Sequence, residues 1–192
     1  MLSGAIWLLL SWLVAGIPTG LILATLFADT DITQEGSHNI GATNVARVLG
    51  RDIGLMTLTG DVFKGFLPVL GALLLLESST LASLCALVCF CGHCWSPYIA
   101  FRGGKGVATV AGCMLALSPF VLVAAVLVWS LLFMWKRIAS LSALGAAGVL
   151  PLAALAITPT LWWVCGLLSL GIVWRHRTNI ERLREGQERP WR

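Results

Sequence analysis

The strongest constraint on this chain is a succession of uncharged apolar runs, several of them long enough to cross a lipid bilayer. A spanning helix needs about 20 mostly apolar residues, and the run from Gly106 to Trp135 contains no charged residue. Across the chain 58% of the residues are hydrophobic and 11% are charged, whereas a soluble domain carries about a quarter charged residues. The sequence therefore predicts an all-α integral membrane protein and excludes a disordered chain or a nucleic-acid-binding domain.

Seven segments are predicted to be transmembrane or half-membrane helices. The long run divides at Ser118-Pro119, because proline lacks a backbone donor and restricts the residue before it. Its first part is only about 16 Å long at 1.5 Å per residue, so it is expected to be a half-membrane helix. The first segment has no basic leader or small-residue cleavage site and is expected to be retained. The predicted helices cover 1–28, 53–76, 78–101, 107–117, 119–135, 138–157 and 161–174.

The positions of the basic residues indicate which side of the membrane each connection and each terminus faces. With the N-terminus outside and the C-terminus in the cytoplasm, the cytoplasmic pieces contain every Lys and Arg except Lys64. This distribution follows the positive-inside rule, whereas an even number of spans would place Lys136 and Arg137 outside. Because helices and short polar connections account for the length, one membrane domain, 1–192, is expected. The cytoplasmic pieces are 29–52, 102–106, 136–137 and 175–192.

The first polar cluster on the cytoplasmic side is GSHNIGATNVAR at 36–47. Its hydroxyls, carboxamides and guanidinium stand among small residues that let the backbone approach a ligand. Backbone N–H groups and the bidentate fork of Arg47 suit a phosphate. A capped surface loop leading into a short helix explains the same residues, and at this point both interpretations stay open.

The second cluster, FRGGKGVAT at 101–109, joins two apolar helices. Glycines around Lys105 at the start of a helix form an anion cradle of backbone amides and one mobile charge. The spacing is not that of a P-loop, and no strand precedes it. The alternative is a tight turn with a positive-inside anchor, although a turn alone does not require three glycines together with Arg102 and Lys105.

The third cluster is RHRTNIERLREGQE at 175–188. On a helix His176 and Asn179 share a face, whereas His176 and Glu181 lie about 140° apart around the axis. A catalytic His–Glu dyad is therefore not predicted. The alternative interpretation is a solvated basic tail that touches anionic lipid headgroups, which is expected for the last arginines of the chain.

Two features inside the apolar segments have more than one explanation. Asp61 and Lys64 can pair along one helix face. A charged side chain inside a membrane span costs about 2.5–3.5 kcal/mol even on a lenient scale. Both a functional and a structural role of the pair stay open. All six cysteines lie in apolar stretches and are expected to be reduced thiols. The order Cys91-Gly-His93-Cys94 lacks a second ligand pair, so no metal site is predicted, and His93 is expected to hydrogen-bond at the helix end.

In their order along the chain, GSHNIGATNVAR, GHCWSPYIAFRGGKGVAT and HRTNIERLREGQE resemble the signature segments of the bacterial acyl-phosphate:glycerol-3-phosphate acyltransferase family (PlsY). DVFKG at 61–65 also fits, and the resemblance covers nearly the whole chain. It implies a seven-helix inner-membrane enzyme that makes lysophosphatidic acid, the first step of bacterial phospholipid synthesis. The family usually has glycine where this chain has His38.

The resemblance implies site residues in all three clusters. We expect Arg47, Lys105 and the glycine-loop amides to bind phosphate. His176 is expected to position phosphate or to accept the proton of the attacking hydroxyl, which the leaving phosphate could also take. The residues predicted to be catalytic are Ser37, Arg47, Lys105, His176 and Asn179. Those predicted to bind substrate are Asn39, Gly41, Thr43, Asn44, Gly103, Gly104, Gly106, Ser140 and Glu188, with Gly186 in the same motif and Ser142 a weaker candidate.

The expected reaction is direct attack of the primary hydroxyl of glycerol 3-phosphate on acyl phosphate, which is already an activated mixed anhydride. The sequence has no G-x-S-x-G elbow that would point to a covalent intermediate. No metal, nucleotide or other cofactor is required. The expected partners are the two substrates, membrane lipid and, by functional coupling, the soluble enzyme that makes acyl phosphate. An anion transporter also gathers basic loops but needs polar groups through the membrane depth, and a scaffold without chemistry leaves the clusters unexplained.

Overall fold

The computed structural model describes residues 2–191, and within that range every regular element is a helix. The chain forms two compact units, divided between Leu117 and Ser118. Five helical stretches in the described range are long and apolar enough to cross a membrane. The predicted all-α architecture is confirmed, whereas the count of seven membrane helices and the orientation of the termini stay predictions.

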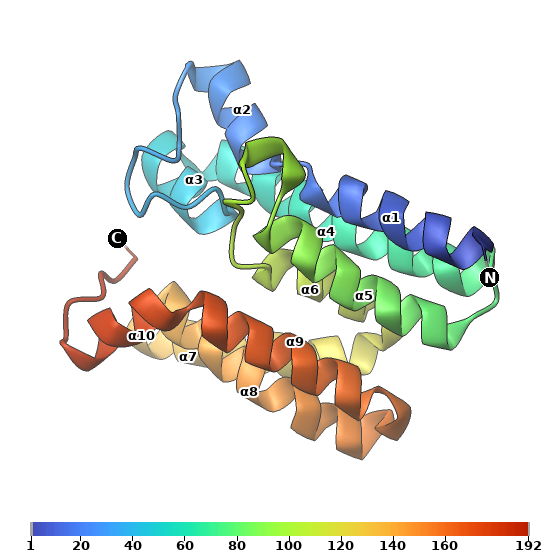
Figure 1. The fold of residues 1–192 in the computed structure, drawn as a ribbon. Helices are drawn as coiled ribbons and strands as arrows, with labels where there is room; N and C mark the ends of the chain where they lie inside the picture. Colours follow the sequence, from blue (N-terminus) through green and yellow to red (C-terminus); the bar gives the residue numbers. More distant parts are fainter. Residues whose placement is uncertain (1, 192) are drawn as a thin grey trace. The chain divides into compact units, whose positions relative to one another are not determined.

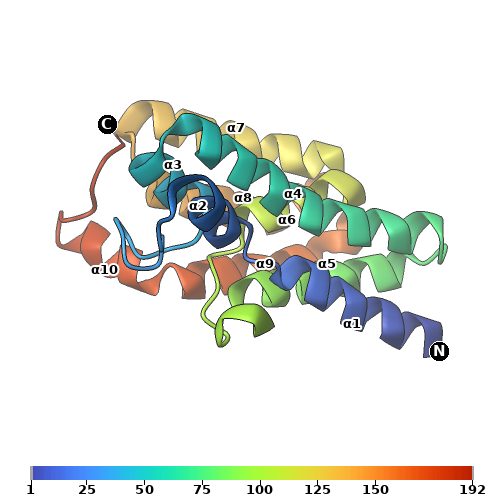
Figure 2. The same ribbon diagram turned by 90° about the horizontal axis from the view of Figure 1, so that it is seen from above.

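In the first unit α1, α4, α5 and α6 run side by side, and α2 and α3 lie at one end (Figure 1, Figure 2). The close contact of α4 with α6 depends on small residues: a Cβ on Gly65 would collide with the Thr109 carbonyl oxygen, and one on Gly112 with the Val62 carbonyl oxygen. Membrane helices commonly approach through such residues. The helices are α1 (Leu2–Gly16), α2 (Thr19–Ala28), α3 (Ala42–Leu49), α4 (Arg51–Leu74), α5 (Ser79–Cys94) and α6 (Val107–Leu117).

The first apolar run, Leu2–Ala28, is long and apolar enough to cross a membrane, as predicted, but it is not one continuous helix. α1 ends at Gly16, α2 begins at Thr19, and Pro18 lies between them. Proline cannot donate to the preceding turn, and Figure 1 shows α2 leaving the direction of α1. In the sequence this break is indicated by Gly16-Ile17-Pro18, but the run has no charged residue that would mark the end of a helix.

Side chains from other helices bind the carbonyl groups at this break. Ser96 Oγ donates to the Gly16 carbonyl at 2.6 Å, and Lys64 Nζ donates to the Ile17 carbonyl at 2.8 Å. A carbonyl group without a partner costs several kcal/mol in a bilayer, so a broken helix persists there only when neighbours supply donors. The break is therefore held by the packing of α4 and of the segment after α5.

The second unit consists of three packed helices and a shorter terminal one (Figure 1). Ser118 Oγ and Thr158 Oγ1, 2.9 Å apart, join the start of α7 to the end of α8. A single 3₁₀ turn, Pro159–Leu161, leads into α9. The helices are α7 (Pro119–Lys136), α8 (Ala139–Ile157), α9 (Trp162–Arg175) and α10 (Arg177–Arg184).

The other predicted segments correspond closely to observed helices. Segment 107–117 coincides with α6, and α7 begins at Pro119, which confirms the division at Ser118-Pro119. Segments 53–76, 138–157 and 161–174 differ from α4, α8 and α9 only at their ends. Segment 78–101 ends as an α-helix at Cys94 and continues through a 3₁₀ turn, Pro97–Ile99.

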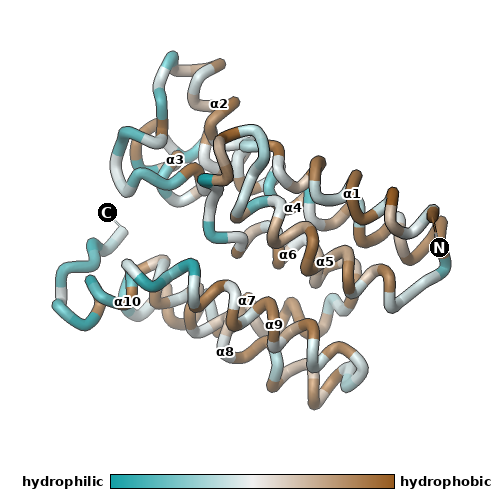
Figure 3. Tube along the Cα trace, viewed as in Figure 1, coloured by the Kyte–Doolittle hydropathy of each residue, from teal (hydrophilic) through white to brown (hydrophobic). Residues whose placement is uncertain are grey.

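Many large apolar side chains face outward on the long helices, and small residues fill part of the helix contacts. On α7, Leu127, Leu131 and Met134 are exposed, whereas the buried face of α5 includes Ala82 and Ala86. Figure 3 shows the hydrophobic colour along the long helices and hydrophilic colour on the α2–α3 connection and the α10 end. Within each unit the polar clusters therefore lie at a helix end and not along the apolar bundle.

Candidate functional site

Asn44 organises the loop that precedes α3. It is buried in the first turns of that helix, where its Oδ1 accepts from the Ser37 amide at 2.8 Å. Its Nδ2 donates to the carbonyl groups of Glu35 and Asn39, each at 2.9 Å. The polar atoms of the side chain therefore support the loop around Ser37, and the predicted contact of Asn44 with phosphate stays a prediction.

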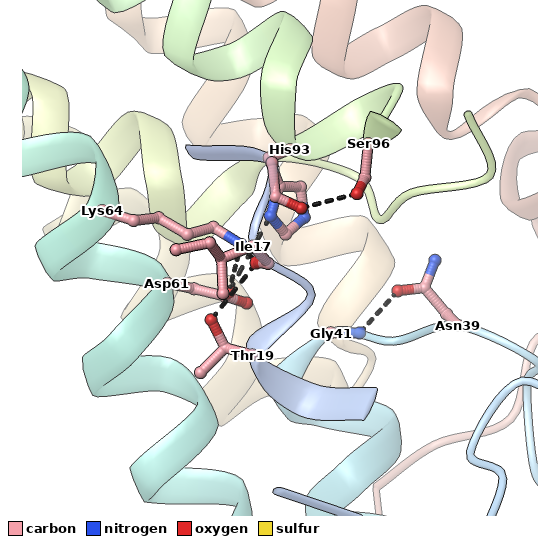
Figure 4. Close-up of polar contacts among 9 residues, drawn as sticks. Ile17, Thr19, Asn39, Gly41, Asp61, Lys64, His93 and Ser96 are labelled. Atoms are coloured by element: carbon pink, nitrogen blue, oxygen red, sulfur yellow. Dashed lines mark hydrogen bonds and ion pairs between the residues drawn. The ribbon is translucent and has the colours of Figure 1, made fainter. Parts of the chain in front are cut away.

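Asn39 and Gly41 form the turn into α3. The Asn39 Oδ1 accepts from the Gly41 amide at 2.9 Å, the local pattern of an Asx turn. Figure 4 shows this contact at the start of the helix. On α3 itself Thr43 and Arg47, four residues apart, are exposed on one face. Ser37 is exposed as well, so these three predicted residues are accessible to a ligand.

A small apolar cluster brings the first two motifs to the same end of the first unit. Ile32, Ile40 and Val45 are buried together with Ala24 of α2, and Ile99 packs against them. Ile99 belongs to the turn before the glycine loop at 103–106. The first motif and the approach to the second are therefore neighbours in the fold, although more than fifty positions separate them in sequence.

The glycine loop rests on the last turn of α5. The amide of Gly103 donates to the Cys94 carbonyl, and that of Gly104 donates to the His93 carbonyl, each at 3.1 Å. Both amides are hydrogen-bonded within the protein, and the prediction that the loop amides bind phosphate stays a prediction. Lys105, half-buried, and Gly106, which comes directly before α6, keep their predicted roles as expectations.

The buried charges of α4 lie next to this loop support (Figure 4). Asp61 Oδ1 is 2.8 Å from Lys64 Nζ, which confirms the predicted pairing, and 3.8 Å from His93 Nδ1. All three side chains are nearly inaccessible to solvent. From sequence, the Asp61–Lys64 pair is compatible with a functional or a structural role. Its contact with His93 joins α4 to α5 and cannot be inferred from the sequence.

In the second unit His176 occupies the junction between α9 and α10. It is buried, and its Nδ1 lies 2.8 Å from the Ile172 carbonyl oxygen. A carbonyl only accepts, so Nδ1 carries the proton, and Nε2 is the acceptor nitrogen of the neutral ring. This assignment supplies the ring atom that a hydroxyl proton would need. Asn179, in the first turn of α10, is buried too.

Glu188 is the centre of a hydrogen-bond network within the second unit. Its Oε1 accepts from Ser140 Oγ at 2.6 Å and from Asn179 Nδ2 at 2.7 Å, and its Oε2 accepts from Arg182 Nε at 2.7 Å. Burial raises the pKa of the Glu188 carboxyl, but the bonds from Arg182, Ser140 and Asn179 outweigh it and hold the pKa below its usual value. Within this network Glu188 positions Ser140 and Asn179, and its predicted contact with substrate stays a prediction.

Gly186 makes this network possible. It follows α10 with a φ of +68°, a left-handed conformation in which a Cβ is unfavourable. Through this turn the chain reverses, and the Glu188 amide donates to the Arg182 carbonyl at 3.2 Å. Arg182, which lies in the third motif but was given no role from the sequence, is also part of the network. Ser142 is buried and donates to the Ile138 carbonyl at 3.0 Å, one turn earlier in its own segment.

Comparison with known proteins gives these motifs a context. A family model described as glycerol-3-phosphate acyltransferase matches residues 5–186. The glycerol-3-phosphate acyltransferase of Trichlorobacter lovleyi is 42% identical over 190 residues, which covers 98% of this chain and 97% of the relative. That of Syntrophotalea carbinolica is 42% identical over 192 residues, with the same two coverages.

Solved structures agree with this result. The fold matches the crystal structure of PlsY (YgiH), an integral membrane glycerol 3-phosphate acyltransferase, in its glycerol 3-phosphate form. The TM-score is 0.93 at 33% identity, over 99% of this chain and 96% of the other. The lysophosphatidic acid form gives a TM-score of 0.90 at 32% identity. The chain, an all-helical integral membrane protein, therefore belongs to the glycerol-3-phosphate acyltransferase family.

Proposed function

We propose that this protein transfers an acyl group from acyl phosphate to the primary hydroxyl of sn-glycerol 3-phosphate, giving lysophosphatidic acid and inorganic phosphate. The observation that carries the proposal is that its structural relatives are described in glycerol 3-phosphate and lysophosphatidic acid forms, the acceptor and the product of one reaction. Both substrates bear phosphate groups, which suit the exposed Arg47 and the half-buried Lys105.

The reaction proceeds in one displacement. The hydroxyl oxygen attacks the acyl carbonyl carbon, the new ester bond forms, and the anhydride bond to the phosphate oxygen breaks. The hydroxyl proton goes to His176 Nε2 or to the departing phosphate. Nδ1 of His176 is engaged with the Ile172 carbonyl, which holds the ring in the tautomer that accepts at Nε2. Substitution of His176 by Gln separates the two routes, because an essential base cannot be replaced by an amide.

Each predicted site residue then has a role consistent with its surroundings. Arg47 and Lys105 bind phosphate, with the hydroxyls of Ser37 and Thr43 as further donors. Asn179 and Ser140 are both held by Glu188 and are proposed to contact the substrate. Positioning and electrostatic stabilisation supply most of the rate in such a displacement, because the donor is already activated.

We further propose that residues 1–192 act as one acyltransferase domain in the bacterial inner membrane, with the site facing the cytoplasm. The distribution of Lys and Arg supports this orientation. The acyl chain would lie among the apolar helices, with its phosphate at the membrane surface. A soluble enzyme that makes acyl phosphate would then deliver the donor from the cytoplasmic side.

Donor choice tests the proposal. Purified protein in detergent is given glycerol 3-phosphate with palmitoyl phosphate, palmitoyl-CoA or palmitoyl-acyl carrier protein, and lysophosphatidic acid is measured. Only palmitoyl phosphate is expected to support turnover. Turnover with a thioester and not with palmitoyl phosphate would refute the donor assignment. Detergent abolishes any membrane gradient, so product formed there comes from an enzyme. No product from any donor would instead favour an anion transporter or a scaffold.

Substitution of the two cations tests the phosphate-binding assignment. Arg47→Ala and Lys105→Ala are each expected to lower kcat/KM about ten- to a hundredfold, since a bond to a charged group contributes about 1.5–3 kcal/mol. Arg51→Ala removes an exposed arginine at the start of α4 and serves as the matched control. Near-normal turnover in both test variants would contradict the assignment.

A further inference from the structure

The buried charges of α4 have partners on two sides. Lys64 Nζ contacts the Asp61 carboxylate and the Ile17 carbonyl, each at 2.8 Å, so the lysine is explained by the break between α1 and α2. Asp61 also faces His93 Nδ1 of α5 at 3.8 Å. A neutral donor could satisfy the Ile17 carbonyl without a buried carboxylate. The break alone therefore does not account for Asp61 opposite His93.

His93 supports the glycine loop in two ways. Its carbonyl accepts the amide of Gly104 at 3.1 Å, next to the parallel bond from Gly103 to the Cys94 carbonyl. Its ring also lies against the loop, because a Cβ on Gly104 would collide with Nε2. The Nδ1 atom of the imidazole thus faces Asp61, and the Nε2 atom lies against Gly104 (Figure 4 shows the Asp61 side).

A loop with so many glycines needs support from outside. Glycine has the largest backbone freedom of any residue, so Gly103, Gly104 and Gly106 cannot by themselves fix the direction of the lysine between them. The bonds from Gly103 and Gly104 to α5 restrict the backbone on one side of Lys105. The His93 ring restricts it further, since the loop can approach α5 only as far as the ring allows.

We propose that Asp61 and His93 are positioning residues for the acyltransfer reaction: Asp61 orients the His93 ring, and the ring fixes the glycine loop and with it Lys105. Both side chains are buried, so in this arrangement they act through the loop and not by touching the substrate. The proposal rests on the proposed function for the role of Lys105. The geometry of the loop itself is independent of that role.

Hydrogen exchange of the loop amides gives a readout that needs no activity. In the folded wild-type protein the amides of Gly103 and Gly104 are expected to be protected, since both are hydrogen-bonded. Asp61→Asn and His93→Ala are expected to raise their exchange rates at least about tenfold, because the loop opens more often. Cys91→Ala, an exposed site on α5 two residues from His93, is the matched control and is expected to leave exchange unchanged.

Kinetics and a double variant then separate positioning from general stability. At a temperature where the variants remain folded, Asp61→Asn and His93→Ala are expected to lower kcat/KM at least about tenfold. Gly104→Ala is expected to be severely impaired in the wild-type background. Its additional effect is expected to be at least about fivefold smaller in the His93→Ala background, where the ring no longer occupies the position of the new Cβ.

Three results would overturn the proposal: unchanged loop exchange in folded His93→Ala, unchanged kcat/KM in that variant, or losses from His93→Ala and Gly104→Ala that simply multiply. If Asp61→Asn does not fold, His93→Ala alone decides. If the wild-type protein does not use palmitoyl phosphate, the proposed function fails while the exchange measurement still decides whether Asp61 and His93 hold the loop.

Discussion

At the scale of single residues, His38 shows how the backbone constrains the first motif. Its φ is +56°, in the left-handed region, and its Nδ1 lies 3.1 Å from the Thr33 carbonyl oxygen. A left-handed conformation costs a non-glycine residue about 1–2 kcal/mol. The glycine that the family resemblance leads one to expect at this position is explained by that conformation, and here the ring contact with Thr33 compensates part of the cost.

Glycine at position 38 is therefore expected to be tolerated better than alanine. His38→Ala keeps the unfavourable φ and loses the ring contact. His38→Gly also loses the contact, but glycine adopts a positive φ without steric cost. His38→Gly is expected to melt about 2–4 °C above His38→Ala, which corresponds to about 1 kcal/mol in a chain of this length. Thermal unfolding of the purified proteins in one detergent measures the difference. A melting temperature of His38→Gly below that of His38→Ala would show that φ at this residue is not a constraint.

Residue identity was enough to predict the chemistry of the clusters, but not which group each side chain binds. Arg47 and Ser37 are exposed, as a ligand site requires. Asn44 and Glu188 look from sequence like ligands, yet both are used to hold neighbouring groups in place. The sequence cannot distinguish the two uses, because a carboxamide or carboxylate suits a substrate and a backbone loop equally well. Only the fold shows which partner is within reach.

At the scale of elements, proline shows why helix boundaries were only partly predictable. Pro119 begins α7 and Pro18 separates α1 from α2, whereas Pro68 and Pro151 lie inside α4 and α8. Proline removes a donor in every case. What differs is whether other side chains hold the chain in a new direction, and this depends on residues distant in sequence, as Ser96 and Lys64 show at the first break.

The network around Glu188 predicts a pH dependence of stability. Because its folded-state pKa lies below the usual 4.5, its contribution is present above pH 4.5 and is lost as the pH falls through the lowered value. Glu188→Gln removes that contribution, since the amide has one acceptor oxygen and its nitrogen leaves either Arg182 or the pair Ser140 and Asn179 without an acceptor. The variant is expected to melt below wild type at pH 7, and the difference is expected to shrink below pH 4.5.

Melting curves of the two proteins between pH 7 and pH 3 provide this comparison. Glu185→Gln, which changes an exposed carboxylate in the turn after α10, is the matched control and is expected to follow wild type. A difference between Glu188→Gln and wild type that stays constant down to pH 3 would mean that the ionised carboxylate does not stabilise the network.

At the scale of the whole molecule, the order of the motifs and the apolar spacers between them predicted both the class of protein and its family. Most helices follow from hydrophobic length alone, because a bilayer sets that length. The supports of the site do not follow from it. The Asp61–His93 contact joins α4 to α5, and Ser140 meets Glu188 across 48 positions of sequence. Such contacts depend on how helices pack, which a single sequence does not show.

The central claim is that the acyl group passes directly from one phosphate-bearing substrate to the other. The most direct measurement is a rapid-quench experiment on purified protein with palmitoyl phosphate labelled in its acyl group, with and without glycerol 3-phosphate. Without the acceptor, no label on the protein and no phosphate release above spontaneous hydrolysis are expected. With it, one lysophosphatidic acid is expected for each phosphate released. An acyl-protein adduct, or a burst of phosphate before the acceptor is added, would contradict the account.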